Sequence, residues 1–244
     1  LRAAGVRAEW LDARGARALE PALSGHVLGG LRIDDHGFTA MPPMIDALAT
    51  AARMRGAVFH TPADVTRIEP APGAAVRLHV SGTPQVFDHA VLAAGSWSNR
   101  LKAGSVPIRP IKGQLVRLRF ERPPATRVLW SEGCYMVPWQ DGTLLVGATM
   151  EDAGFDERPT AAAVSSLLEA AALLLPSAKE AAFVDVRAGL RPSADGPLPE
   201  IGPSLSHEHV TIAAGHFRNG VLLAPLTAKL VADHVLEGCH AKTH

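Results

Sequence analysis

The chain of 244 residues lacks the features that mark several common protein classes. Its two cysteines, Cys134 and Cys239, cannot form the dense disulfide network of a small secreted domain. Lys plus Arg and Asp plus Glu number 24 each, so no excess of positive charge points to nucleic acid. This composition excludes a disulfide scaffold and a nucleic-acid-binding domain, and it predicts a cytoplasmic protein.

No apolar run is long enough for a membrane-spanning helix. The nearest candidate is AAAVSSLLEAAALLLP at 161–176, which is short, is rich in alanine and contains Glu169. Its apolar residues follow helical spacing, so it predicts a helix with one buried face. No signal peptide precedes the first domain-like residues, and the chain begins with Leu1 rather than Met. We therefore expect a partial chain without a membrane span.

Several site motifs are also missing. No G-x-G-x-x-G occurs, the glycines at 215 and 220 lack the Lys-Ser/Thr of a phosphate-binding loop, and AGSWS at 94–98 lacks the second glycine of a nucleophile elbow. The histidines and the cysteine near the end of the chain do not have the spacing of a structural zinc site. We expect no metal at these residues, which are His207, His209, His234, Cys239, His240 and His244.

Three segments carry helix signals. Residues 39–56 have Thr39 as a candidate cap, prolines at the start and Gly56 at the end. The helix that follows Thr160 ends before a proline, and the last helix begins near Gly220, because Pro225 is tolerated only close to a helix start.

The middle of the chain is rich in strand patterns. They follow one another from about 111 to 190, and the Asp-Gly pair at 141–142 predicts a hairpin turn, so we expect an antiparallel sheet. Strand patterns at 57–70, 76–80 and 89–98 join the first helix in an α/β arrangement. The prediction is a mixed α/β (α+β) fold with a nucleotide-domain-like unit that is interrupted by a β-rich insertion.

The stretch from Val210 to Val235 joins a buried strand to a long apolar helix through the polar segment Gly-His-Phe-Arg-Asn-Gly at 215–220. The free amides and positive dipole end of a helix N-terminus favour an anion or an electron-rich ring near Arg218. Glycine at both ends of the segment lets the backbone approach a flat ligand. An ordinary polar loop would also explain these residues.

Two more side chains are candidates for a site. Tyr135, the only tyrosine, lies in a predicted strand, where a packing role is the alternative. Arg191 ends a predicted strand on the face shared with Asp185 and Arg187, where a solvated strand face is the alternative.

Taken in order, several motifs resemble the glycine oxidase branch of the D-amino-acid oxidase family, FAD-dependent oxidoreductases associated with thiamine biosynthesis. The motifs are GLRIDDHGFTAMPPMIDALATAARMRGA, VLAAGSWS, IRPIKGQLVRL, YMVPWQDGTLLVGATMEDAGFD, GLRPSADGPLPEIGP and AAGHFRNGVLLAP. The resemblance covers nearly the whole chain and implies a D-amino-acid-oxidase-like FAD-binding fold that lacks its N-terminal βαβ unit. The chain would correspond to the C-terminal two-thirds of such an enzyme.

The resemblance also implies a domain organisation. Residues 1–40 would be a lead-in segment with a strand of the substrate domain, and 107–202 would form the antiparallel-sheet substrate domain. The remaining parts of the FAD-binding domain would be 41–106 and 203–244.

FAD is the implied cofactor. By the same resemblance, the substrate-binding residues would be Arg191, which would pair with a substrate carboxylate, Arg218 and Tyr135. The cofactor-binding residues would be Val65, Gly95, Trp97, Gly215, His216, Phe217, Arg218, Asn219, Gly220, Val221 and Leu222.

The implied reaction is oxidative deamination of a small amino acid or amine, of glycine or sarcosine type, to a keto acid, ammonia and hydrogen peroxide. Oxygen would be the electron acceptor, and the formation of a homo-oligomer stays open. Two alternatives remain: an amino-acid dehydrogenase of the same fold, and a non-catalytic remnant or subunit that needs a partner for the nucleotide-binding unit.

Overall fold

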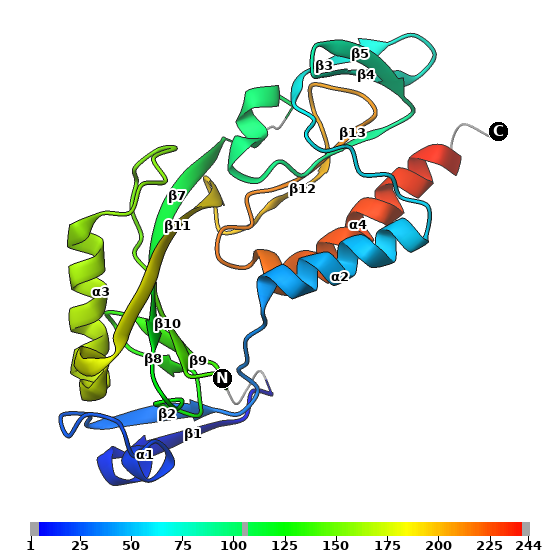
Figure 1. The fold of residues 1–244 in the computed structure, drawn as a ribbon. Helices are drawn as coiled ribbons and strands as arrows, with labels where there is room; N and C mark the ends of the chain where they lie inside the picture. The colour runs from blue at the N-terminus through cyan, green and yellow to red at the C-terminus, as the bar shows by residue number, and fades with distance from the viewer. Residues whose placement is uncertain (1–4, 104–106, 241–244) are drawn as a thin grey trace. The chain divides into compact units, whose positions relative to one another are not determined.

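The computed structural model describes residues 5–103 and 107–240 (Figure 1). The chain divides into two compact units, each built from several segments. Unit 1 comprises 1–58, 113–150 and 157–189, and unit 2 comprises 59–112, 151–156 and 190–244. Strands β7 (Ile108–Arg119) and β11 (Ala182–Ala194) contribute residues to both units.

Unit 1 is built on a five-stranded sheet with the order β11-β7-β10-β9-β8. Strands β8 (Leu129–Trp130), β9 (Tyr135–Pro138) and β10 (Thr143–Gly147) pair antiparallel with their neighbours, as predicted. The predicted hairpin turn joins β9 to β10: the Trp139 amide donates to the Thr143 carbonyl at 2.8 Å, and Gly142 has a φ of +85°.

Helix α3 (Ala161–Leu174) covers one face of this sheet, as its periodicity predicts. Thr160 caps it by accepting from the Ala163 amide, and the helix ends before Pro176. Met136, which is completely buried, packs with α3 residues such as Leu167 in the core of unit 1. Because successive side chains of a strand point to opposite faces, Tyr135 lies on the other face of the sheet.

One strand was expected within residues 1–40, whereas the structure has two strands and a short helix in this part of unit 1. Strand β1 (Ala8–Asp12) pairs antiparallel with β2 (Gly29–Ile33), and between them lies the short helix α1 (Ala13–Leu19). Helix α2 (Met41–Met54) follows, but its cap is Ala40, not Thr39. Thr39 was therefore the wrong capping residue, since the two prolines already set the first turn and no side chain caps it.

Unit 2 contains two three-stranded sheets. In the first, β3 (Val65–Ala71), β4 (Ala75–Val80) and β5 (Thr83–Phe87) are antiparallel. The prediction of strand throughout 57–70 was wrong in its first half, because β3 starts at Val65. Strand β5 was missed: all five of its residues are exposed, so it lacks the apolar alternation that marks a strand.

The second sheet of unit 2 has the order β12-β13-β6 and leads to the last helix. Strand β13 (Val210–Ala214) pairs parallel with β6 (Ala90–Leu92) and antiparallel with β12 (Glu200–Pro203). Helix α4 (Gly220–His240) begins where the sequence predicts, although Pro225 lies in its second turn.

These units do not follow the predicted domain limits at every segment. Residues 41–58 belong to unit 1, whereas 151–156 and 190–202 belong to unit 2. The assignment of a FAD-binding and a substrate domain stays a prediction.

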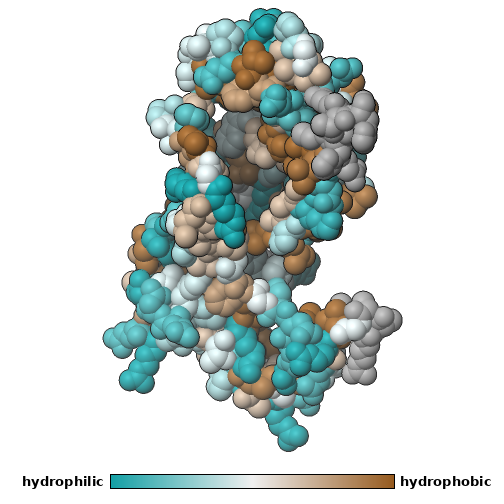
Figure 2. Space-filling model, turned by 90° about the vertical axis from the view of Figure 1, so that its right-hand side faces the viewer, coloured by the Kyte–Doolittle hydropathy of each residue, from teal (hydrophilic) through white to brown (hydrophobic). Residues whose placement is uncertain are grey.

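Apolar side chains are also found on the surface. On the face that Figure 2 shows, hydrophobic residues are exposed among hydrophilic ones. Within 5–103 and 107–240, no helix is both long and apolar enough to cross a membrane.

Candidate functional site

The polar segment 215–220 starts at a glycine that no larger residue can easily replace. Gly215 has a φ of +80°, and a Cβ there would lie 2.9 Å from the Ala194 Cβ and 3.0 Å from the Ile108 Cδ1. Both neighbours belong to the buried core of unit 2. The chain therefore leaves β13 in a left-handed conformation and in close contact with this core, which requires glycine.

His216 anchors the segment on both sides. Its Nε2 lies 2.9 Å from the Oγ1 of the buried Thr227 in α4, and it forms an isolated antiparallel bridge with Ser193 at the end of β11. Burial lowers the pKa of the His216 imidazole, because desolvation disfavours its charged form. The bond to Thr227 and the bridge to Ser193 make His216 a structural link between α4 and β11.

The same bridge joins the segments that carry two of the predicted substrate-binding residues. The amide of Phe217 donates to the carbonyl of Pro192 at 2.7 Å, and the chain turns at Phe217, whose φ is +49°. Arg191 precedes Ser193 by two residues and Arg218 follows His216 by two residues, so each arginine lies next to the bridge. Arg191 is partly buried and Arg218 is exposed. Two guanidinium groups carried on adjacent segments are suited to hold a carboxylate.

The segment that begins at Gly95 also contacts β11, next to Arg191. The 3₁₀ helix Gly95–Leu101 follows β6, and the buried Ser96 donates from Oγ to the carbonyl of Leu190 at 3.3 Å. Gly95 has a φ of +56° and no atom within 4 Å of the position of a Cβ, so its surface is open. Arg191 is the next residue after Leu190, and Gly95 precedes Ser96. The predicted residues Gly95 and Arg191 therefore belong to one locality of unit 2.

Two other predicted cofactor-binding residues, Trp97 and Val65, also belong to unit 2. The ring of Trp97 is 39% exposed, and its centroid lies 5.8 Å from that of Phe155. The Arg100 guanidinium lies 5.2 Å from the same Phe155 ring. Val65 pairs with Val80 in the sheet of β3, β4 and β5, which is not the sheet that carries segment 215–220.

Tyr135 belongs to unit 1, whereas the other predicted site residues belong to unit 2. It pairs with Gly147 of β10 on one side and with Trp130 of β8 on the other. A Cβ on Gly147 would lie 2.6 Å from the tyrosine Oη, so the phenol extends over this glycine. The Trp130 and Tyr135 rings are 5.1 Å apart between centroids.

The start of α4 has the electrostatics of a site for an electron-rich group. The first turn of the helix contains no acidic residue, and Arg218 lies two residues before it. The first amides of an α-helix have no acceptor within the helix, and its dipole is positive at this end. Together with the glycines of the segment, these groups fit the negatively polarised edge of a flat cofactor such as FAD.

The sequence analysis missed the roles of three residues that contact β11, His216 and Tyr135, respectively: Ser96, Thr227 and Gly147. Ser96 was considered only as a nucleophile, although its role in the structure is the bond to β11. Thr227 lies in a segment with the pattern of an apolar helix, and its role is recognised only from its contact with His216 in the structure. The signal at Gly147 was a lone glycine in a strand, which often marks a close approach by another group.

Lys112 is a further buried polar residue of unit 2. Its side chain is only 1% exposed, and its Nζ lies 3.9 Å from an oxygen of Glu151. The two backbones also exchange hydrogen bonds of 2.9 Å, so this pair attaches segment 151–156, which carries Phe155, to β7.

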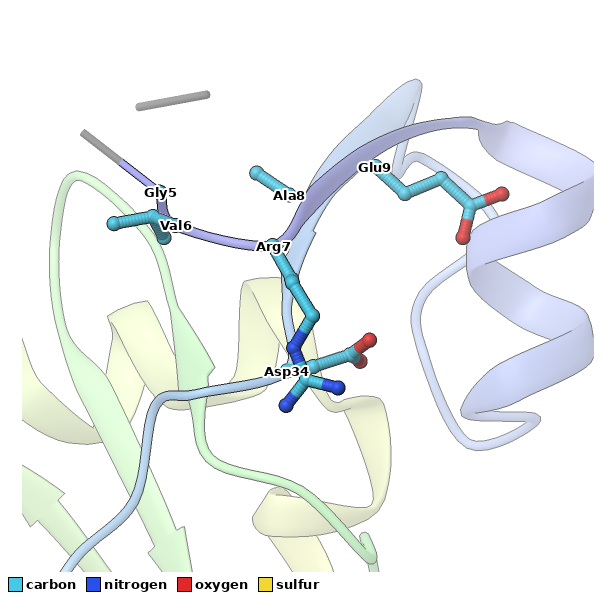
Figure 3. A pocket seen from close by; sticks show the side chains of 6 residues that line it. All are labelled: Gly5, Val6, Arg7, Ala8, Glu9 and Asp34. Carbon is cyan, nitrogen blue, oxygen red and sulfur yellow. The ribbon is translucent and has the colours of Figure 1, made fainter. Parts of the chain in front are cut away.

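Two other kinds of site receive no support. A hollow of about 350 Å³ beside β1 is lined by Gly5 to Glu9 and Asp34, and Figure 3 shows Val6 and Glu9 directed away from Arg7. Arg7 bonds to Asp35 and lowers the pKa of that carboxyl, but both groups are open to solvent. Among the described residues, no three His, Cys, Asp or Glu side chains are grouped to hold a metal. The side chains of Cys239 and His240, and the whole of His244, lie outside the part of the chain that the structure describes.

Comparison with known proteins decides the family. Residues 1–234 match the family described as FAD dependent oxidoreductase. The chain belongs to this family. It is 36% identical over 239 residues to a glycine oxidase from Geobacillus kaustophilus, covering 96% of this chain and 63% of that protein. It is also 33% identical over 234 residues to the bifunctional protein ThiO/ThiG from Trichormus variabilis, covering 94% of the chain and 35% of the relative.

Solved structures confirm the fold. The crystal structure of the glycine oxidase from Geobacillus kaustophilus superposes with a TM-score of 0.91 at 34% identity, covering 97% of this chain and 65% of that one. L-proline dehydrogenase from P. horikoshii, at 20% identity, shares the fold with a TM-score of 0.87. The chain thus spans about 63% of the length of the curated glycine oxidase. The predicted resemblance, fold and FAD-dependent family are confirmed.

Proposed function

We propose that this chain is the part of an FAD-dependent oxidase that binds a small amino acid or amine and one edge of the cofactor. The observation that carries the proposal is the bridge between Ser193 and His216, which joins the segment of Arg191 to the segment of Arg218 before the start of α4. Glycine oxidases among the relatives support the choice of a small amine, of glycine or sarcosine type.

FAD, when bound, supplies an acceptor for the hydride that leaves the substrate Cα. Segment Gly215–Leu222 would hold the edge of the ring system where negative charge gathers, because the start of α4 is positively polarised and has no acidic residue. Gly95, Trp97 and Val65 would contribute further contacts to the cofactor.

Arg191 and Arg218 would bind the substrate carboxylate, and Tyr135 is proposed as a third substrate-binding residue. A substrate that binds with a neutral amine needs no catalytic base, so these residues would act by holding it in place. The net reaction takes one amine, O₂ and water to a keto acid or aldehyde, H₂O₂ and ammonia, or methylamine when sarcosine is oxidised. The two electrons and the hydrogens that the amine loses reappear in H₂O₂, and water supplies the carbonyl oxygen.

The test is steady-state kinetics of the complete gene product purified with FAD, with glycine, sarcosine, D-alanine and D-phenylalanine as substrates. We expect H₂O₂ in proportion to ammonia, or to methylamine when sarcosine is the substrate, and a preference for the small amines. Arg191→Gln should raise the KM for glycine by roughly 30-fold or more, as for the loss of one charge-assisted pair, while flavin content stays unchanged. Arg122→Gln, at an exposed position of unit 1, is the matched control.

Three results would contradict the proposal. One is a preference for D-phenylalanine, which would remove the small-substrate assignment. Another is amine oxidation without H₂O₂ that depends on an added electron carrier, which would identify a dehydrogenase of this fold. The third is an unchanged KM in Arg191→Gln, which would return Arg191 to a solvated strand face.

A further inference from the structure

A hollow of about 750 Å³ lies entirely within unit 1, on the sheet face opposite α3. It is formed where the hairpin of β9 and β10 meets the start of α2, elements that are labelled in Figure 1. Its volume is within the range of ligand pockets, which is roughly 300–1,000 Å³. The lining has an apolar side with Phe38, Met41, Trp139 and Leu145, and a basic side with Arg117 and Arg187.

The apolar side has a defined shape. The rings of Phe38 and Trp139 meet edge to face, with centroids 4.9 Å apart and planes at 80°. Phe38 is still 49% exposed, so this pair offers aromatic surface that the core of unit 1 does not use. Leu145 is only partly buried on the same sheet face, beside its strand partner Val137. An apolar or aromatic body would bury these surfaces favourably.

The basic side carries more positive than negative charge. Arg117 and Arg187 both bond to one oxygen of a single carboxylate, Oδ2 of Asp185. Two buried atoms of this group, Arg117 Nε and Asp185 Oδ1, have no hydrogen-bond partner among the residues that the structure describes. Buried polar atoms without a partner are rare in native proteins, and here one is a donor and the other is an acceptor. Asp141, which also lines the pocket, pairs with Arg119, so three arginines are set against two carboxylates and the local charge is +1. This positive charge favours an anion with acceptor oxygens.

We propose that this pocket binds a small organic acid with one carboxylate and an apolar or aromatic body. The carboxylate would accept hydrogen bonds from Arg187 and Arg117, and the body would pack against Phe38, Trp139 and Leu145. Leu145 precedes Gly147, the partner of Tyr135, by two residues, so the pocket is displaced from Tyr135 by about 7 Å along the strand. None of the proposed substrate-binding residues Arg191, Arg218 and Tyr135 lines this pocket, so we treat it as a second site whose occupation does not depend on the proposed oxidase reaction.

The test is a titration of the 244-residue chain, labelled with [methyl-¹³C]methionine, with 3-phenylpropionate as the probe. Met41 lines the pocket, and Met41→Leu assigns its methyl resonance. We expect a saturable shift of this resonance and a dissociation constant at least about fivefold weaker for the neutral 3-phenylpropanamide. Arg187→Gln should weaken binding by about five- to tenfold, because Arg187 is exposed and its loss leaves the fold intact. Arg14→Gln, on an exposed position of α1, is the control.

A cavity-filling variant gives a second line of evidence. Leu145→Phe adds bulk on the pocket side of the sheet and should abolish the shift while the far-ultraviolet circular dichroism stays unchanged. The proposal is overturned by equal binding of the acid and the amide, by equal effects of Arg187→Gln and Arg14→Gln, or by the absence of a saturable shift. Displacement of the probe by glycine would also overturn it, because the acid would then occupy the proposed substrate position.

Discussion

Replacement of Gly215 by alanine tests whether packing or backbone conformation makes this glycine necessary. The left-handed conformation costs a non-glycine residue roughly 1–2 kcal/mol. The new methyl group would also lie 2.9 Å from the Ala194 Cβ and 3.0 Å from the Ile108 Cδ1, and overpacking of this kind costs about 1–3 kcal/mol. We therefore expect Gly215→Ala to lower the unfolding free energy by about 2–5 kcal/mol, a large part of the roughly 5–15 kcal/mol of a typical domain.

The matched control is Gly73→Ala in the same unit. Gly73 has a φ of +77°, close to the +80° of Gly215, but no atom lies within 4 Å of the position of its Cβ. Urea unfolding of both variants, followed by circular dichroism, should show only the conformational cost for Gly73→Ala. The difference between the two variants, about 1–3 kcal/mol, is the packing contribution. Equal destabilisation of the two variants would refute the argument that the core of unit 2 presses on this position.

Three further predictions concern single residues. Gly147→Ala should displace the ring of Tyr135, because the new Cβ would overlap it. Tyr135 is the only tyrosine, so a chain labelled with 3-fluorotyrosine has a single ¹⁹F resonance, and this resonance should shift in the variant. An unchanged resonance would mean that the ring does not extend over this glycine. The lowered pKa of His216 means that the unfolded state takes up its proton first, so this residue's contribution to stability is complete above about pH 6.5 and is lost as the pH falls below it. His216→Asn should therefore reduce the fall in unfolding free energy between pH 7 and 5, and an identical pH profile would contradict this assignment. Thr160→Ala should destabilise unit 1 by about 1 kcal/mol through loss of the α3 cap, whereas Ser165→Ala, on the exposed side of α3, should cost less in the same urea titration.

Local features of the structure were readable from the sequence because their causes lie within a few residues. The Asp-Gly pair at 141–142 specifies the hairpin, and the alternation along the strand places Tyr135 and Met136 on opposite faces of the sheet. Thr160 identifies the start of α3, whereas Thr39 failed as a cap because two prolines already shape the first turn of α2. Such signals have a short range and need no knowledge of the remainder of the chain.

Other features depend on which distant segments meet, and only the tertiary structure decided them. The parallel pairing of β13 with β6 joins residues about 120 positions apart, and the sequence of neither strand indicates which strand it pairs with. The bridge from Ser193 to His216 then joins the segments of Arg191 and Arg218, two residues that the resemblance implied as functional but could not place. Likewise, in the sequence Arg117 and Arg187 look like ordinary charged residues of two strands. In the folded sheet both form ion pairs with Asp185, beside apolar side chains. Sequence determined the elements and their buried faces, whereas long-range pairing determined which polar groups share a site, because burial and hydrogen bonding between distant segments arise only in the folded chain.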